Sequence, residues 1–315
     1  DFQIKKIILP SGKEVNASTY VDTLSSDGTY IYKVLDNRGK TTEKSVTVKI
    51  DKVNPTIQVT WDKNPTNGNV VLTIKATDDK SGIKQVQKPN GEADPRSSFT
   101  YNIYENGSYT FTAEDLAGNK TSVTAVVDNI DRTKPTIKIE TNGNSNYAKS
   151  HSTKVTVSDD KSGIQTAQYA WSTSNTTQPS SWTNFTSGST ITTPATTGNH
   201  YLWIRAVDKA GNETIATSNL FRVDATAPTF SASPASGDWK TSAYTVTPTY
   251  GDSHSGVATR QYAWSTSTST PSSWNTYTSG TLTQPGAGTH YLHYRVVDVA
   301  GNEKVGYVGP YRYEA

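Results

Sequence analysis

Four copies of one short phrase, an aspartate followed three residues later by a glycine, recur along the chain. They lie at residues 36–40, 115–119, 208–212 and 298–302, spaced 79, 93 and 90 residues apart. Each copy follows a run of alternating apolar and polar residues, which predicts a β-strand that ends in a tight turn. A period of about 80 to 90 residues is the size of a small domain, not of a hairpin or a solenoid turn. The sequence therefore predicts an array of all-β domains.

The composition narrows the class of protein. Only 33% of the 315 residues are hydrophobic, the net charge is +2, and the sequence has neither cysteine nor methionine. Abundant Thr, Ser, Tyr and Val favour strands over helices. No apolar run is long enough to span a membrane, and no basic stripe is present for nucleic acid. The lack of cysteine fits a cytosolic protein or a bacterial surface protein, and the repeat array with its polar loops favours the second.

Short acidic linkers followed by Pro-Thr mark where each complete unit opens. The linkers begin at Asp51, Asp131 and Asp224. Each linker is about four residues long, so we expect a semi-rigid, elongated rod rather than freely swivelling domains. The predicted domains are the truncated C-terminal part of one unit at residues 1–54, followed by complete units at residues 55–134, 135–227 and 228–315.

The first unit differs from the others in length. Residues 4–40 align with residues 83–119 without a gap, which places Gly28 on Gly107 and Tyr30 on Tyr109. The residues that would form the first two strands of this unit are missing. A half-sandwich exposes strand edges and an open core, so we expect residues outside this sequence to complete it, as in an internal piece of a longer protein.

The third and fourth units share the most motifs. Both contain a Tyr-Ala-Trp-Ser-Thr-Ser strand, at residues 169–174 and 262–267, and a Pro-Ser-Ser-Trp loop. The order of Pro-Thr opening, Asp-x-x-Ser-Gly turn, Tyr-x-Trp strand and Arg-x-x-Asp-x-Ala-Gly-Asn turn resembles the tandem bacterial immunoglobulin-like repeats. These occur in Gram-positive surface proteins, adhesins and secreted polysaccharide-degrading enzymes. The resemblance spans essentially the whole chain and implies immunoglobulin-like β-sandwiches, but it does not specify a ligand.

Acidic residues gather where the turns and linkers of such sandwiches meet. Carboxylates and loop carbonyls are the oxygen ligands that Ca²⁺ prefers. The alternative is that these acids only cap turns through their side chains. The fourth unit has Ser253 in place of the second acid of its turn, so we expect a weaker site there. The candidate calcium ligands are Asp51, Asp78, Asp79 and Asp115 in the second unit and Asp131, Asp159, Asp160 and Asp208 in the third.

Aromatic residues suggest a second kind of site. Period-two spacing directs one set of side chains outward from the Gly-led strands of the third and fourth units. Such a face can stack on sugar rings. The alternative is that a neighbouring strand, or the loop residues Trp182 and Trp274, cover it. The covered arrangement is favoured. Trp171 and Trp264 are expected in the core. The candidate glycan-binding residues are Tyr201, Trp203, Arg205, Tyr291, His293 and Arg295.

Catalytic chemistry has no support in the sequence. The five histidines have no metal-ligand spacing, and neither a nucleophile elbow nor a phosphate-binding loop is present. The sequence therefore predicts a non-enzymatic, extracellular spacer or stalk of a bacterial cell-surface protein, such as an adhesin. The alternatives are a glycan-binding module and the accessory region of a secreted carbohydrate-active enzyme. Expected partners are a host or cell-surface glycan or protein and the neighbouring domains of a longer chain.

Overall fold

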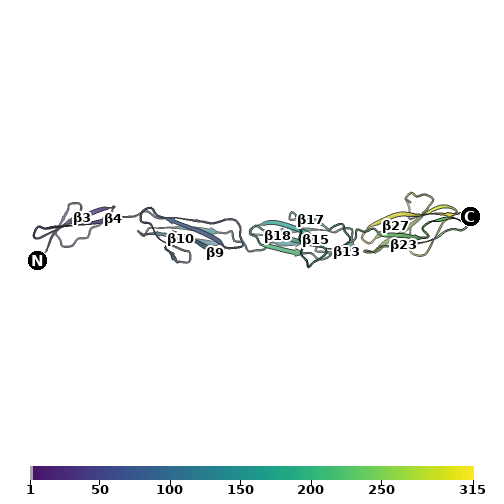
Figure 1. Cartoon of the computed structure of the whole chain (residues 1–315), viewed down its shortest axis with the longest axis horizontal. Coiled ribbons are helices and arrows are strands. Elements are labelled where there is room, and N and C mark those ends of the chain that lie inside the picture. Colours follow the sequence, from purple (N-terminus) through teal and green to yellow (C-terminus); the bar gives the residue numbers. More distant parts are fainter. Residues whose placement is uncertain (1–2) are drawn as a thin grey trace. The chain divides into compact units, whose positions relative to one another are not determined.

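The structure, a computed structural model, describes residues 3–315, and this range contains strands, turns and loops but no helix. It divides into two compact units, one ending at Ile130 and one comprising Asp131–Ala315. The strands of both units can be followed in Figure 1. Nothing in the described part of the chain forms a helix long and apolar enough to cross a bilayer.

The first repeat is a single four-stranded sheet. Its strands lie in the order β2-β1-β3-β4, and β3 pairs antiparallel with β4 from Gly28 opposite Val48 to Leu35 opposite Thr41. No second sheet is formed by residues 3–54, and within that range Leu9 is the only buried hydrophobic side chain. The strands are β1 (Ile4–Ile8), β2 (Glu14–Val15), β3 (Gly28–Asp36) and β4 (Thr41–Val48).

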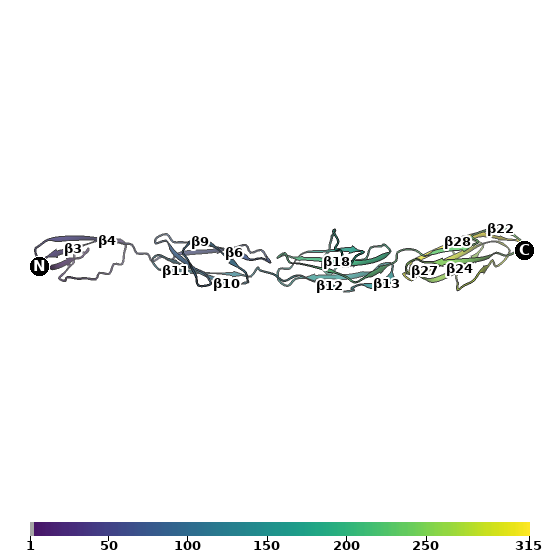
Figure 2. The same ribbon diagram turned by 60° about the horizontal axis from the view of Figure 1, so that its bottom comes forward.

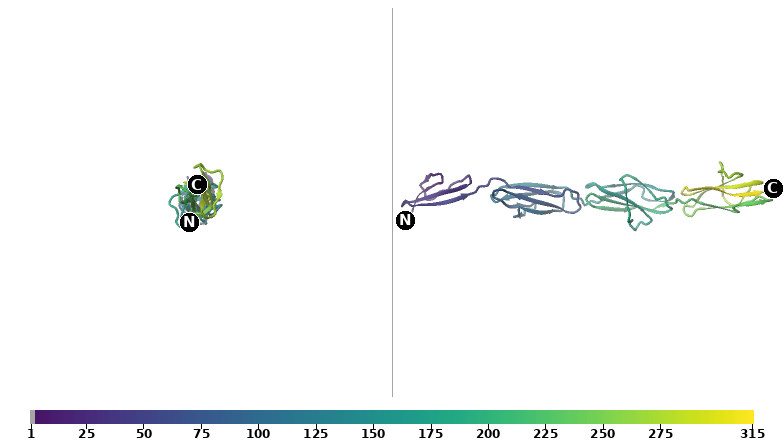
Figure 3. Two further views of the ribbon diagram at one scale, coloured as in Figure 1. Left: turned by 90° about the vertical axis from the view of Figure 1, so that its right-hand side faces the viewer. Right: turned by 45° about the horizontal axis from the view of Figure 1, so that its top comes forward.

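The second repeat is a complete two-layered sandwich. One layer has the order β5-β6-β9 and the other β11-β10-β7-β8. Strand β6 alternates strictly between buried and exposed residues, as expected for a strand with one face on a core. Its layers can be followed in the right-hand view of Figure 3. The strands are β5 (Thr56–Thr60), β6 (Val70–Thr77), β7 (Ile83–Gln87), β8 (Ala93–Asp94), β9 (Ser98–Ile103), β10 (Gly107–Asp115) and β11 (Lys120–Val127).

The third repeat is also a two-layered sandwich, with one additional strand. Its layers are β12-β14-β17 and β13-β20-β18-β15-β16, with β19 also paired to β18. The additional strand β13 crosses to the second layer and pairs parallel with β20. Figure 2 shows β12 and β18 in different layers. The strands are β12 (Thr136–Ile139), β13 (Asn144–Ala148), β14 (Ser152–Ser158), β15 (Ile164–Ser172), β16 (Thr183–Asn184), β17 (Thr190–Thr192), β18 (Gly198–Asp208), β19 (Glu213–Thr217) and β20 (Phe221–Val223).

The fourth repeat matches the third, except that one long last strand replaces two. Its layers are β21-β23-β26 and β22-β28-β27-β24-β25, and β22 pairs parallel with β28. The strands are β21 (Thr229–Ser233), β22 (Gly237–Lys240), β23 (Thr245–Gly251), β24 (Val257–Ser265), β25 (Asn275–Thr276), β26 (Leu282–Thr283), β27 (Gly288–Asp298) and β28 (Glu303–Tyr313).

Each complete repeat closes its own apolar interior. Leu72 and Ile74 are fully buried in the second repeat, Leu202 and Ile204 in the third, and Leu292 in the fourth. The three core clusters share no residue, so each sandwich removes its own apolar surface from water. The predicted fold, tandem immunoglobulin-like β-sandwiches with an incomplete first unit, is confirmed. The domain boundaries at residues 54, 134 and 227 stay a prediction.

Candidate functional site at the acidic junctions

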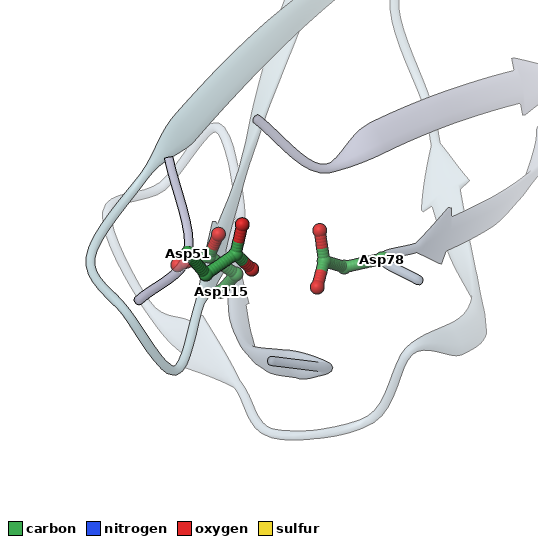
Figure 4. A group of neighbouring side chains, drawn as sticks. All are labelled: Asp51, Asp78 and Asp115. Atoms are coloured by element: carbon green, nitrogen blue, oxygen red, sulfur yellow. The ribbon is translucent and has the colours of Figure 1, made fainter. Parts of the chain in front are cut away.

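Three aspartates meet at the entry of every complete repeat. The first begins the linker, the second begins the Asp-x-x-Ser-Gly turn, and the third begins the Asp-x-x-Gly-Asn turn. In each group the three side chains offer ligand atoms that lie within 4.8 Å of one another. Figure 4 shows the carboxylate of Asp78 turned toward those of Asp51 and Asp115. The groups are Asp51, Asp78 and Asp115; Asp131, Asp159 and Asp208; and Asp224, Asp252 and Asp298.

The turn aspartate is held by the backbone of its own turn. Asp78 Oδ1 accepts hydrogen bonds from the N–H groups of Lys80 at 3.1 Å, Ser81 at 2.8 Å and Gly82 at 2.9 Å. Gly82 has a φ of 79°, a left-handed conformation that glycine adopts without strain. This explains why the motif needs an acid at its first position and a glycine at its fifth.

The asparagine of the second turn ties two of the three aspartates together. In the fourth repeat Asn302 Nδ2 donates both to Asp298 Oδ2 and to the backbone carbonyl of Asp224, each at 2.8 Å. Its backbone N–H donates to Asp298 Oδ1 at 2.7 Å. The same three bonds occur at Asn119 and Asn212. An amide nitrogen with two hydrogens satisfies both acceptors at once, which explains the residue type.

The linker aspartate is bonded by the following repeat. The Ser81, Ser162 and Ser255 N–H groups donate at 3.1 Å to Asp51, Asp131 and Asp224 respectively. The Val53 N–H, followed by Ser81, holds the pKa of Asp51 below its ordinary value. For Asp131 and Asp224 burial raises the pKa, but the hydrogen bonds outweigh burial and the net pKa is lowered. The hydrogen bonds therefore keep these carboxylates ionised.

The sequence prediction and the structure differ on which acids belong to these groups. Asp79 and Asp160, the second acids of their turns, are exposed and lie outside the three groups, because only the first acid folds back over the turn. The fourth repeat, expected to be weaker, brings Asp252 to Asp224 and Asp298 as closely as its counterparts, and Ser253 lies exposed beside the group. The other six predicted aspartates converge in their two groups.

Two buried carboxylate oxygens in these groups have no hydrogen-bond partner. Asp159 Oδ2 and Asp252 Oδ2 are shielded from solvent and accept no hydrogen bond. Asp208, Asp224 and Asp298 are each at most 2% exposed. Three closely spaced carboxylates repel one another, and a buried oxygen without a partner costs about 1–3 kcal/mol. A hard cation with oxygen ligands would offset the repulsion between the carboxylates and would give the buried oxygens a partner. Ca²⁺ is a cation of this kind.

A second set of contacts holds the segment that leaves each of the first three repeats. The Ile50 N–H donates to Asp27 Oδ1 at 2.6 Å, and the Ile130 N–H donates to Asn106 Oδ1 at 2.9 Å. In the third repeat the Ala225 N–H donates to Thr197 Oγ1 at 2.9 Å. The sequence analysis missed these residues. The signal was present, because each is the polar residue directly before the glycine that starts strand β3, β10 or β18.

The predicted glycan face is largely covered. Trp203 is 8% exposed and its indole Nε1 donates to the Ser174 carbonyl at 2.9 Å, while His293 is 2% exposed and bonded to the Ser267 carbonyl at 2.8 Å. The loops after β15 and β24 therefore cover these two side chains, which is the covered arrangement favoured above. Tyr201 and Tyr291 are half-buried.

The two predicted arginines are bonded within the sheet surface. Arg205 pairs with Glu213 and donates to Gln168 Oε1, and Arg295 donates to Glu303 Oε1 at 2.6 Å and to Gln261 Oε1 at 2.9 Å. Each arginine thus bridges the two strands that flank its own. A sugar hydroxyl would have to compete with these contacts.

The comparisons with known proteins found similar solved structures at low sequence identity. No family model and no curated protein matches it. Among solved structures, a tetra-tandem repeat from the extending region of a large adhesion protein covers 96% of this chain and 89% of its own, at 17% identity and a TM-score of 0.27. The Escherichia coli adhesin FdeC covers 86% and 100%, at 17% identity and a TM-score of 0.31.

Fibronectin(III)-like modules of Clostridium thermocellum CbhA cover 53% of this chain and 94% of their own, at 16% identity and a TM-score of 0.27. The fold of this chain follows from its own strand order and its separate cores.

Proposed function

We propose that this chain is a non-catalytic extracellular spacer of a bacterial cell-surface protein, in which tandem sandwiches hold a functional region away from the surface, as in the stalk of an adhesin. The observation that carries the proposal is the arrangement of the junctions. In the linker inside each unit, neighbouring groups are bonded to the repeat before the linker and to the repeat after it. A linker that is hydrogen-bonded on both sides restricts the motion of one repeat against the next, which is what a spacer requires.

The junction inside the second unit shows this most fully. The Asp224 N–H donates to the Ala148 carbonyl of the third repeat at 3.0 Å. The carboxylate of Asp224 accepts the Ser255 N–H, and its carbonyl accepts Asn302 Nδ2, both from the fourth repeat. Asp224 is fully buried. One residue is therefore bonded to two sandwiches, and its backbone torsions are fixed by both.

Spin-label distances test this proposal, and the absence of native cysteine makes the labelling specific. Gln165→Cys and Ala258→Cys place labels on exposed positions of β15 and β24. We expect a narrow distance distribution in the otherwise native chain and a broader one after Asn302→Ala. A distribution that is broad from the start would contradict a stiff junction and, with it, the spacer function.

The glycan-binding alternative has less support. Burial of Trp203 and His293 removes two of the six predicted contacts, and the two arginines are engaged by glutamates and glutamines. A glycan array on the intact chain separates the alternatives. A spacer should give no signal, whereas binding that is lost on Tyr291→Ala would favour the glycan-binding module.

We further propose that the three junctions bind Ca²⁺ and that the ion stiffens the linker. The support is the convergence of three carboxylates and the unpartnered oxygens of Asp159 and Asp252. We expect Ca²⁺ to raise the melting temperature and EDTA to reverse the change. Asp252→Asn should remove only the part of this increase in melting temperature that comes from the fourth repeat. Asp160→Asn, at an exposed site outside the groups, serves as the control. Identical melting in Ca²⁺ and in EDTA would rule the ion out.

A further inference from the structure

Two loops, one in the third repeat and one in the fourth, consist mainly of hydroxyl side chains. The first follows β15 at residues 173–181 and has six Ser or Thr among its nine residues. The second follows β24 at residues 266–273, where every residue except Pro271 is Ser or Thr. Neither loop contains a charged residue. At the corresponding place after β7, the second repeat has Lys-Pro-Asn-Gly-Glu at residues 88–92, without a hydroxyl. The sandwich plan by itself therefore does not require this composition.

The hydroxyls of the loop at residues 266–273 are accessible to solvent and mostly unpaired. Every residue of the loop is exposed except Pro271, which is half-buried. Ser267 Oγ accepts the Ser269 N–H at 3.1 Å. Within residues 3–315, no hydrogen bond is made by the hydroxyls of Thr266, Thr268, Ser269, Thr270, Ser272 and Ser273.

Folding does not explain why these residues carry hydroxyls. The loop is fixed to the sheet through its backbone, because the Ser267 carbonyl is bonded to buried His293 at 2.8 Å. The loop of the third repeat is held in the same way, by the bond from Trp203 to the Ser174 carbonyl at 2.9 Å. Every residue type has a carbonyl, so this contact does not select serine. Tight turns favour Gly, Pro, Asn, Asp and Ser, so turn formation does not select threonine either.

We propose that the loop at residues 266–273 is a site of O-linked glycosylation and that the loop at residues 173–181 is a second one. Uncharged segments rich in Ser and Thr with proline are typical of O-glycosylated stalks. An exposed, irregular loop can enter the active site of a modifying enzyme without breaking any strand pairing. This inference goes beyond the spacer function, because it assigns a covalent modification site and the class of group that it carries.

The reaction is the transfer of a glycosyl group from a nucleotide sugar by a separate enzyme. A Ser or Thr Oγ forms a bond to the anomeric carbon of the sugar, and the bond between that carbon and the phosphate oxygen of the donor breaks. The hydroxyl proton passes to a base of the enzyme, and the nucleoside diphosphate leaves with the electron pair. The attached sugars would shield the loop backbone, since exposed loop tips with small polar residues are the preferred sites of proteolysis.

Mass spectrometry of tryptic peptides from the protein, isolated from the organism that encodes it, tests this proposal. Trypsin releases the loop in the peptide 261–295, which contains no Asn-x-Ser/Thr sequence for N-linked sugars. The peptide 97–120 has most of its Ser and Thr within β9 and β10 and serves as the internal control. We expect the peptide 261–295 to carry the added mass of at least one whole sugar residue within residues 266–273. Alkaline β-elimination should remove this mass, and the peptide 97–120 should be unmodified.

Two variants of the protein, produced in the same organism, show whether the hydroxyls are the attachment points. The added mass on the peptide 261–295 should be retained in the variant that carries T266S, T268S and T270S. It should be lost in the variant that carries T266A, T268A, S269A, T270A, S272A and S273A. The melting temperature should change in neither variant, because the loop is anchored through a carbonyl.

Three results would overturn the proposal. The first is an unmodified peptide 261–295 in the native protein. The second is an added mass that phosphatase removes, because the attached group would then be a phosphate. The third is equal modification of the peptide 97–120, because the loop would then not direct the reaction.

Discussion

The first and second repeats contain the same four-stranded layer, but only the second has another layer packed on it. Ala125 is 2% exposed, whereas its counterpart Val46 is 42% exposed, and Ile7 is half-buried where Val86 is fully buried. Strand pairing within the layer is intact in both repeats. The comparison shows that the strand order is the same with and without the facing layer, whereas burial of the apolar side chains requires that layer.

The largest expected difference between the two repeats concerns this interior. Leu72→Ala should lower the free energy of unfolding of the second repeat by about 2–5 kcal/mol, since it leaves a cavity in a closed core. Tyr20→Ala in the first repeat should cost about 0.5 kcal/mol or less, because that side chain is exposed. Hydrogen exchange in urea, read at β10 and at β3, measures both. Equal losses would mean that the first repeat already has a closed core.

A smaller difference is expected at the turn after β10. Asn119→Ala removes the side-chain bonds to Asp115 Oδ2 at 2.7 Å and to the Asp51 carbonyl at 3.3 Å. Leaving these acceptors unpaired should lower the stability of the second repeat by about 1–3 kcal/mol. The first repeat has Lys40 at this position, and Lys40→Ala should change stability by no more than about 0.5 kcal/mol. An unchanged midpoint for Asn119→Ala would show that the amide does not hold the junction.

The smallest expected effect is a change in the melting temperature of the second repeat on acidification. Burial raises the pKa of Asp115, but hydrogen bonds from Asn119 and the turn N–H groups outweigh it, and Val53 and Ser81 lower the pKa of Asp51. A carboxyl whose pKa is lower in the folded state stabilises it above the unfolded pKa of about 4 and loses this contribution as pH falls through the folded value. The melting temperature of the second repeat should therefore fall between about pH 4 and pH 2.

Asn119→Ala provides the control for acidification, because it removes a hydrogen bond that lowers the pKa of Asp115. Its melting temperature should depend less on pH in the same range than that of the native chain. A native second repeat that melts at the same temperature at both ends of the range would show that these hydrogen bonds do not favour the ionised carboxylates.

Much of the fold could be read from local sequence. Phe111 and Ala113 lie two residues apart on β10 and are both fully buried, as period-two alternation predicts for one face of a strand. The offset of 79 residues predicted an incomplete first unit, and the described residues there form one sheet. These features depend on neighbours along the chain and on cross-strand partners a turn away, so composition and spacing determine them.

The tertiary structure decided the details of the candidate sites. Trp203 lies on the outward side of β18, yet a loop from β15 covers it, which strand periodicity cannot reveal. Asp78 joins the acidic group and Asp79 does not, because turn geometry separates two adjacent carboxylates. Asp27 meets Ile50 across the fold, 23 residues away in sequence. The sequence by itself determined the strands, the turns and the period, since these are local. Only the packing of distant segments decided which polar groups meet and which aromatic side chains remain accessible.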